Sequence, residues 1–170
     1  METERLILRH YEQQDLMPLH ELLSNQENMY YLDDITTQTL DETQENLTHA
    51  MANADGGYFC MIEKQTGAFV GGVGYTITAE TPLGKIGHMG FFILPRFQGK
   101  GYTAEGAKEV LKYAFAQGGC IRVTTGCFAG NVPSQKVIAK LGFNKEAYRF
   151  KAAYHDGEMK DRIEYGLNRI

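Results

Sequence analysis

A short loop with two glycines, between an apolar segment and a helical one, constrains the fold of this chain more than any other feature. The segment from Arg96 to Gly101 follows the apolar run 89–94 and precedes the helical pattern 102–116. The first N–H groups of a helix have no partner inside the helix and attract anions. Glycines let the main chain approach a bulky phosphate, and Arg96 and Lys100 add positive charge beside it. The sequence therefore predicts a strand–loop–helix unit that binds a phosphate-bearing ligand.

The distribution of charge also favours an anionic ligand near this loop. The whole chain has a net charge of −4. Between Pro95 and Lys145 there are eight basic and two acidic residues, a local charge of +6, so the remainder carries −10. Such a local field favours an anion, although lysines that merely solvate two helices are the alternative. The acidic total argues against general nucleic-acid binding, and we expect no nucleic-acid partner.

The length and composition indicate an ordinary globular domain. With 170 residues, 43% of them hydrophobic and 22% charged, we expect one domain spanning residues 1–170. Cys60, Cys120 and Cys127 are odd in number and lack metal-site spacing, which predicts reduced core thiols and no bound metal. No apolar run approaches the length of about 20 residues that spans a bilayer, and residues 1–5 are unlike a signal peptide. We therefore expect a cytoplasmic protein with no membrane partner.

Hydrophobic periodicity and turn residues predict the order of strands and helices. The expected elements are a strand at 5–10, helices at 15–23 with Asp15 as the cap and 39–52 with Asp55-Gly56-Gly57 after it, strands at 58–63, 68–78 and 85–94, a helix at 102–116, a strand at 120–127, a helix at 133–141 closed by Gly142, and strands at 143–151 and 159–167. This order predicts an α+β fold, with a mixed, largely antiparallel sheet of about seven strands and about four flanking helices.

Two further expectations concern the sheet. The strands before and after the helix 102–116 are expected to run parallel, because a helical crossover joins them. Gly71, Gly72 and Gly74 lie inside a predicted strand, which indicates a bulge or a close backbone contact.

Two common phosphate-binding motifs do not fit the glycine loop. A Walker A motif requires glycine at position 94 and serine or threonine at 101, where this chain has Leu94 and Gly101. The dinucleotide motif is closer, since Gly99, Gly101 and Ala104 match its spacing. That fold also needs an acidic residue about 20 positions further on, and there is no Asp or Glu between positions 110 and 145. Neither nucleotide triphosphate hydrolysis nor dinucleotide binding is therefore expected.

The remaining pattern is [RQ]-x-x-G-x-[GA], present here as Arg96-x-x-Gly99-x-Gly101. In this motif the chain resembles the GNAT superfamily of acetyl-CoA-dependent N-acetyltransferases, and more closely its RimJ/RimL-like branch. The segments that carry the resemblance, in order, are 3–9 (the opening strand), 90–95 (the fourth strand), 98–106 (the pyrophosphate loop) and 131–143 (the N-x-x-S…K-L-G-F segment). The resemblance implies a GNAT-like fold and acetyl-CoA as cosubstrate.

The resemblance also implies roles for particular residues. The loop residues expected to bind the pyrophosphate, mainly through main-chain amides, are Arg96, Gln98, Gly99, Lys100, Gly101, Tyr102 and Thr103. The main chain of Phe92, Ile93 and Leu94 is expected to pair with the pantetheine arm of CoA, as an additional strand would. Asn131 would contact the pantetheine or orient the site, and the hydroxyl of Ser134 would reach the sulfur. Plain helix capping by these last two residues is the alternative.

His88 is the candidate general base. Many relatives carry a glutamate at what looks like this position, and histidine is a competent base at neutral pH. A structural histidine, entry of an already neutral amine, or relay through water are the alternatives. Glu105 also follows the loop, but a carboxylate is favoured in the first turn of a helix by the dipole alone, so it is not expected to be the base.

The region between the first two helices contains the candidate acceptor-site residues Tyr30, Tyr31, Asp33 and Asp34, for which an ordinary solvated turn is the alternative. We expect an enzyme that transfers acetyl directly to a primary amine in a ternary complex. The acceptor is either a protein N-terminus or a small-molecule amine, and the resemblance allows a homodimer. The alternative function is a CoA-binding regulatory or sensor module that lacks transfer activity.

Overall fold

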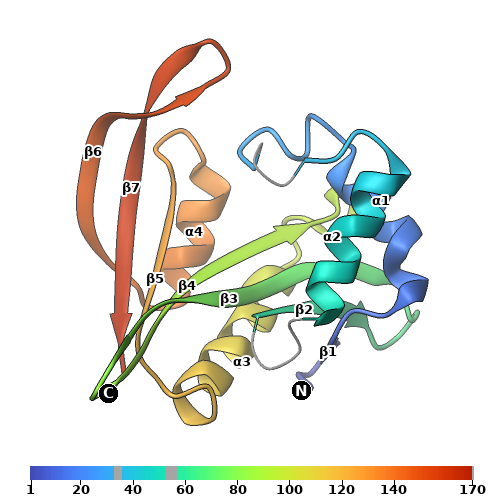
Figure 1. Cartoon of the computed structure of the whole chain (residues 1–170), viewed down its shortest axis with the longest axis horizontal. Coiled ribbons are helices and arrows are strands. Elements are labelled where there is room, and N and C mark those ends of the chain that lie inside the picture. Colours follow the sequence, from blue (N-terminus) through green and yellow to red (C-terminus); the bar gives the residue numbers. More distant parts are fainter. Residues whose placement is uncertain (33–35, 53–56, 170) are drawn as a thin grey trace. The chain divides into compact units, whose positions relative to one another are not determined.

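The computed structural model describes residues 1–32, 36–52 and 57–169 (Figure 1). Asp33, Asp34, Asp55 and Gly56, for which the sequence suggested roles, lie outside these ranges. The elements within them are β1 (Leu6–Arg9), η1 (Gln13–Asp15), α1 (Leu16–Leu23), α2 (Leu40–Ala52), β2 (Gly57–Glu63), β3 (Phe69–Thr81), β4 (Gly84–Ile93), η3 (Pro95–Phe97), α3 (Tyr102–Ala116), β5 (Cys120–Phe128), α4 (Val132–Lys140), β6 (Asn144–His155) and β7 (Glu158–Asn168). The predicted order of strands and helices is confirmed.

The seven strands form one sheet in the order β1-β2-β3-β4-β5-β7-β6. β4 and β5, which α3 connects, are parallel, and the pairs β1–β2, β2–β3, β5–β7 and β6–β7 are antiparallel. The predictions of a mixed, largely antiparallel sheet and of a parallel pair around this helix are therefore confirmed. No helix in the described ranges is long and apolar enough to cross a membrane.

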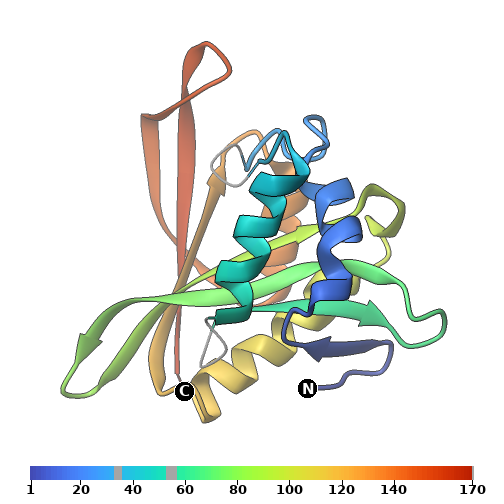
Figure 2. The same cartoon turned by 45° about the vertical axis from the view of Figure 1, so that its right-hand side comes forward.

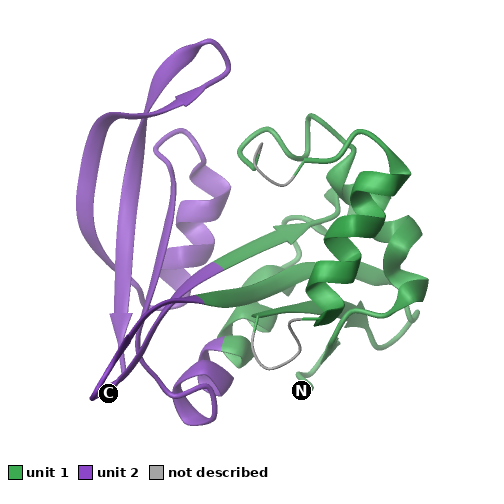
Figure 3. Ribbon diagram, viewed as in Figure 1, with its two compact units in different colours: residues 1–76, 90–110 green, residues 77–89, 111–170 purple. Residues whose placement is uncertain are grey.

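The chain divides into two compact units, coloured in Figure 3. Unit 1 contains residues 1–76 and 90–110, and unit 2 contains residues 77–89 and 111–170. The strands β3 and β4 and the helix α3 each contribute residues to both units.

Unit 1 is built from apolar stripes on its helices and strands. The helix α1 buries Leu19, Leu22 and Leu23, which have the spacing of one helical face. Figure 2 shows α1 and α2 side by side against the strands of this unit. A Cβ on Gly106 of α3 would lie 2.7 Å from Sδ of Met61, so the glycine allows this helix to pack closely on β2.

Asp15 does not cap α1 through its side chain, which corrects the prediction from sequence. Its carboxylate is almost fully buried and accepts hydrogen bonds from Arg9 Nη1 at 2.7 Å and Nη2 at 2.8 Å. It also accepts the main-chain N–H of Glu12 at 2.8 Å. A buried carboxylate requires a charged partner, and the guanidinium on β1 provides a stronger one than the helix end. The same hydrogen bond raises the pKa of Arg9.

The glycines of β3 make close contacts, as predicted, and the structure identifies their neighbours. A Cβ on Gly71 would overlap the main-chain oxygen of Phe92, and one on Gly72 would overlap the ring of the same residue. A Cβ on Gly74 would overlap the main chain of Tyr58. A register shift between β2 and β3 also occurs at Met61. Only glycine fits at positions 71 and 74 without displacing backbone, and at position 72 a Cβ would displace side chains.

Unit 2 has one buried and one open sheet face. Along β5, Val123, Thr125 and Cys127 are buried, and on β7 Ile163 and Tyr165 are buried. Because side chains alternate along a strand, the half-buried residues between them share the opposite face. On that open face lie Thr124, Gly126, Phe128, Arg162 and Glu164.

Candidate active site

Two residues of the loop between β4 and α3 have positive φ angles, which favour glycine. Gly99 has φ of 72° and Gly101 has φ of 85°, both in the left-handed region. Residues 98–101 are exposed, and no atom lies within 4 Å of a Cβ built on Gly99. α3 begins at Tyr102, and the main-chain N–H of Glu105 donates to Gly101 at 3.1 Å. The N–H groups before that bond have no acceptor within the helix and are available to an anion.

Glu105 holds the loop in place from within unit 1. Its carboxylate accepts hydrogen bonds from Arg5 Nε at 2.7 Å, from the Arg5 main chain at 2.9 Å and from Thr3 Oγ1 at 2.5 Å. Arg5 Nη1 in turn donates to the carbonyl oxygen of Lys100 at 3.0 Å. The pKa of Glu105 is lowered, because these hydrogen bonds and the charge of Arg5 outweigh burial, which raises it. This carboxylate is an anchor for the loop, consistent with its exclusion as a base.

The side chains of the loop are largely bound within unit 1. Arg96 forms an ion pair with Glu21, and Gln98 Nε2 donates to Asn28 at 2.9 Å. The main-chain N–H of Gln98 donates to Pro95 at 3.1 Å. Tyr102 Oη donates to Glu63, and Lys100 Nζ lies 5.6 Å from the centroid of Phe97. The loop therefore presents its main chain from Gly99 onward, with the ammonium of Lys100 nearby.

The main-chain groups of β4 alternate between its two edges. Leu94 N–H donates to the carbonyl oxygen of Val70 on β3 at 2.9 Å, and Thr78 Oγ1 of β3 donates to the carbonyl oxygen of Ile86 at 3.1 Å. The even-numbered residues therefore face β3. Phe91 and Ile93 face the other edge. Of the three residues predicted to pair with pantetheine, Ile93 faces this edge, whereas Phe92 and Leu94 face β3.

The ladder between β4 and β5 ends within unit 2. Its described pairs run from Lys85–Cys120 to His88–Thr124. Next to them, Thr125 Oγ1 donates to the carbonyl oxygen of Met89 at 2.9 Å. Sequence reasoning missed Phe91, although the two-residue period of a strand pairs it with Ile93.

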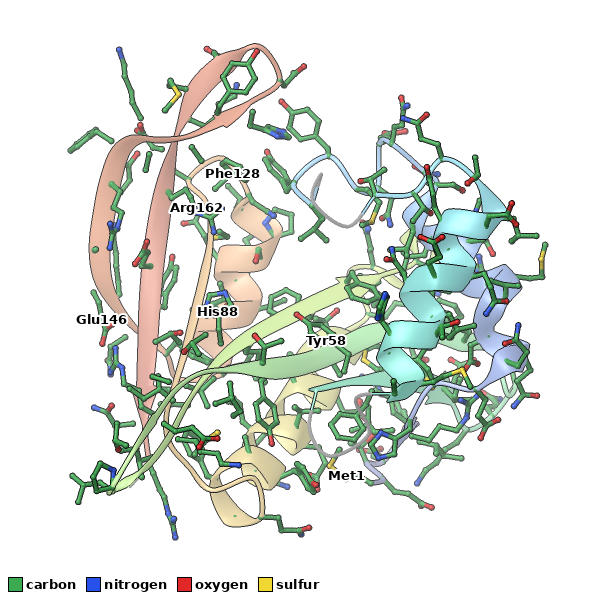
Figure 4. All side chains as sticks on the ribbon, in the orientation of Figure 1. Met1, Tyr58, His88, Phe128, Glu146 and Arg162 are labelled. Carbon is green, nitrogen blue, oxygen red and sulfur yellow. The ribbon has the colours of Figure 1, made fainter. Side chains whose placement is uncertain are left out.

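His88, labelled in Figure 4, lies on β4, and its ring contacts the side chain of Thr124. His88 Nδ1 is 3.1 Å from Thr124 Oγ1, and that hydroxyl is 3.2 Å from the carbonyl oxygen of Gly87. The carbonyl oxygen of Gly87 can only accept, so the hydroxyl of Thr124 donates its one hydrogen to it. The Thr124 oxygen then accepts a hydrogen bond from Nδ1–H of His88. Nε2 then carries the lone pair. Burial lowers the pKa of His88, the charge of Arg162 lowers it further, and Glu164 opposes them.

Asn131 and Ser134 lie at the start of α4, also in unit 2. Asn131 Oδ1 accepts the main-chain N–H of Ser134 at 3.2 Å and so caps the helix. The capping alternative is therefore correct for this oxygen, while Nδ2 is a separate donor. Burial raises the pKa of the Cys127 thiol, and the side chain of Ser134 and the charge of Arg162 oppose the rise.

Aromatic residues lie next to the last residues of β4 in unit 1. The ring of Tyr58 stacks on that of Phe92 with centroids 5.9 Å apart. A Cβ on Gly90 would overlap Tyr58 Oη, so this glycine provides the space for the hydroxyl. Tyr30 and Tyr31, predicted near the acceptor, contact each other edge-to-face with centroids 4.8 Å apart. Sequence reasoning missed Tyr58, because its place depends on the pairing of β2 with β3.

The seven-stranded mixed sheet, with a glycine loop that joins β4 to α3, is a GNAT fold. Residues 5–144 match the family model described as Acetyltransferase (GNAT) domain. The chain belongs to this GNAT family of N-acetyltransferases and is an acyltransferase enzyme.

Individual relatives agree with this assignment over nearly the full length. The chain is 25% identical over 167 residues to the uncharacterized N-acetyltransferase YnaD of Bacillus subtilis, covering 97% of this chain and 94% of that protein. A GNAT-family acetyltransferase from Bacillus anthracis is similar in structure, with a TM-score of 0.86 and 26% identity over 99% of this chain and 97% of that chain. The spermidine N-acetyltransferase from Vibrio cholerae, solved with CoA and spermine, shares the fold, with a TM-score of 0.84 and 20% identity over 96% and 95% of the two chains.

Proposed function

We propose that the protein transfers the acetyl group of acetyl-CoA directly to a primary amine in a ternary complex, with no acyl-enzyme intermediate. The observation that carries this proposal is the edge of β4 away from β3, where Phe91 and Ile93 lead directly into the glycine loop. An extended pantetheine arm can pair with such an edge as a strand does. The pyrophosphate at its end would then meet the main-chain amides from Gly99 to Thr103.

His88 is proposed to accept the proton of the attacking amine at Nε2. The lowered pKa keeps the imidazole neutral at physiological pH, as a base must be. The amine nitrogen forms a bond to the thioester carbon, the carbon–sulfur bond breaks, and CoA leaves as a thiolate. The hydroxyl of Ser134 is proposed to donate a hydrogen bond to that sulfur, and Asn131 to orient the start of α4.

The acceptor is proposed to be a primary amine on a protein N-terminus or on a small molecule. The opening segment 3–9 supports placing the chain in the RimJ/RimL-like branch, and the Vibrio cholerae neighbour, named for spermidine, supports a small-molecule amine. We further propose that residues 1–170 act as one cytoplasmic domain. A single cooperative unfolding transition, seen by several probes, is expected for that domain.

The test is release of the free CoA thiol with a panel of peptides, polyamines, amino acids and aminoglycosides. Saturable, acceptor-dependent release is expected for at least one class of amine, and mass spectrometry should find one acetyl group on that amine. Acetylation of the enzyme itself in single-turnover mixtures would contradict direct transfer. Tight CoA binding without turnover of any amine would instead indicate a regulatory or sensor module.

A further inference from the structure

Arg162 is a charged residue that the proposed chemistry leaves without a role. It lies on β7, opposite Phe128 of β5, and its guanidinium carbon is 5.1 Å from the centroid of the Phe128 ring. Both residues are on the open face of unit 2, and Figure 4 shows Arg162 between Phe128 and His88 in that view. Arg162 is half-buried, so its charge is only partly solvated.

A glycine on β5 lets the guanidinium extend toward the candidate base. A Cβ on Gly126 would lie 3.4 Å from Arg162 Nη2, so the guanidinium lies beside this glycine. Gly126 is two residues from Thr124 on the same strand face, and Thr124 holds His88. The charge of Arg162 lowers the pKa of His88 and that of Cys127. The guanidinium is therefore close enough to act electrostatically on the candidate base His88 and on the buried thiol of Cys127.

Arg162 has no carboxylate partner among the residues that the structure describes. Glu164, two residues along the same face, is bound by Arg149 through Nε at 2.8 Å and Nη2 at 3.2 Å. Asp161 accepts from Tyr148 at 2.8 Å. The contact with the Phe128 ring compensates only part of the hydration that a half-buried guanidinium loses, so the absence of a counter-ion favours an anion from a ligand.

We propose that Arg162 binds a carboxylate on the acceptor, so that the preferred substrates are amines that carry a carboxylate, as amino acids do, rather than polyamines. This inference rests on the proposed acetyl transfer. The planar guanidinium binds a carboxylate through two parallel hydrogen bonds. With the carboxylate at Arg162 and the amine at His88, the acceptor is held at two points, which orients its nitrogen. CoA does not supply this anion, because its phosphates lie at the opposite end of the pantetheine arm from the thioester.

The test compares free lysine with cadaverine, which differ only by the carboxylate. In the wild type, kcat/KM is expected to be higher for lysine. Arg162→Gln is expected to lower kcat/KM for lysine by about 10- to 100-fold more than it lowers kcat/KM for cadaverine, mainly by raising KM for lysine. Arg162→Lys should retain part of the preference. The matched control is Arg122→Gln, which removes the same charge from the same face of the sheet, on β5 instead of β7. Arg122 is paired with Glu146, and this variant should preserve the preference.

Equal kcat/KM for the two amines in the wild type, or equal losses for both in Arg162→Gln, would overturn the inference and leave acetyl transfer intact. A loss of CoA affinity in Arg162→Gln without a change in acceptor KM would overturn it as well.

A second measurement does not depend on turnover. A carboxylate on Arg162 neutralises the charge that lowers the pKa of His88. N-acetylglycine, added to the CoA-bound protein, is therefore expected to raise the pKa of His88 in NMR titrations of the wild type but not of Arg162→Gln. No change in the wild type would overturn the proposed carboxylate site. Absence of turnover with every amine, together with the expected NMR shift, would overturn the proposed function alone.

Discussion

Thr124 Oγ1 lies 3.1 Å from Nδ1 of His88 and determines which nitrogen of the imidazole is free. The hydroxyl also lies 3.2 Å from the carbonyl oxygen of Gly87, so the hydrogen of the imidazole belongs on Nδ1 and the lone pair on Nε2. A base whose tautomer is fixed by a neighbour needs no rearrangement before it accepts a proton.

Thr124→Val keeps the shape of the side chain but removes the hydroxyl. The loss of one neutral hydrogen bond is expected to lower kcat by about 2- to 10-fold, because both tautomers become accessible. Thr124→Ser keeps the hydroxyl and should retain activity close to that of the wild type. Steady-state kinetics at constant pH measure both. If the two variants behave alike, the hydroxyl does not set the tautomer.

His88→Gln tests the base directly through the pH dependence of kcat/KM. The pKa of His88 is lowered from 6.5 by burial, so the wild type should keep the neutral base at pH 7 and lose activity only as the pH falls through this lower pKa. In His88→Gln, activity at neutral pH should fall by about 100-fold or more, and that acid limb should disappear. An acid limb that persists unchanged would assign the titration to the amine substrate or another group.

Ser134→Ala separates a role at the sulfur from a role in the helix. Loss of a hydrogen bond to a departing thiolate is expected to lower kcat by about 10- to 100-fold while CoA affinity changes little. Asn131→Ala is the comparison, since loss of its cap should lower the free energy of unfolding by about 1 kcal/mol. CoA affinity by calorimetry and turnover by thiol release are the measurements. Equal losses of affinity and turnover in Ser134→Ala would indicate a structural role.

Glu105→Gln is expected to weaken CoA binding and protein stability without shifting the pH profile of catalysis. Because the pKa of Glu105 is lowered in the folded protein, its stabilising effect is present above the pKa of the unfolded carboxyl and is lost as the pH falls through the lower folded value. Urea unfolding should therefore show the largest difference between wild type and variant near neutral pH and a smaller one in acid. A shifted pH–rate profile would contradict the assignment of Glu105 as an anchor.

Gly71→Ala should lower the free energy of unfolding more than Gly67→Ala does. At Gly71 the new Cβ would overlap backbone of β4, so the free energy of unfolding is expected to fall by about 2–3 kcal/mol. Gly67 has φ of 73° and open space around it. Alanine at this position would lower the free energy of unfolding by about 1 kcal/mol, only because it must adopt the left-handed conformation. Thermal and urea unfolding measure both. Equal losses would show that β4 moves to accommodate the methyl group.

Local patterns in the sequence were sufficient for the elements of the fold. The helix α3 spans Tyr102–Ala116, as predicted, because glycines bound a strong helical period. The strand β6 extends to His155, beyond the predicted end at Lys151, because an irregularity between Arg149 and Ala153 with φ of 46° at Lys151 lets the strand continue.

The roles of side chains in the candidate site were harder to predict, because they depend on contacts between segments far apart in the sequence. Asp15 was expected at a helix end, but Arg9 on the neighbouring strand binds it more strongly. The glycine pattern indicated a close contact without identifying Phe92 as the neighbour. The sequence alone does not identify Arg162 as a site residue, since a lysine- or arginine-bearing strand near the end of a chain has no distinctive local pattern.

In the proposed function, the edge of β4 away from β3 couples the stability of the protein to the supply of acetyl-CoA. If acetyl-CoA pairs with Phe91 and Ile93, the cosubstrate acts as a temporary strand that each turnover removes and replaces. Amide hydrogens of these two residues should then exchange quickly in the empty enzyme and slowly when it is loaded. At a cosubstrate concentration 100 times Kd, binding would add about 2.7 kcal/mol to the free energy of unfolding. In cells with little acetyl-CoA, the free energy of unfolding of the protein would be lower. The lifetime of the protein would then depend on the concentration of acetyl-CoA.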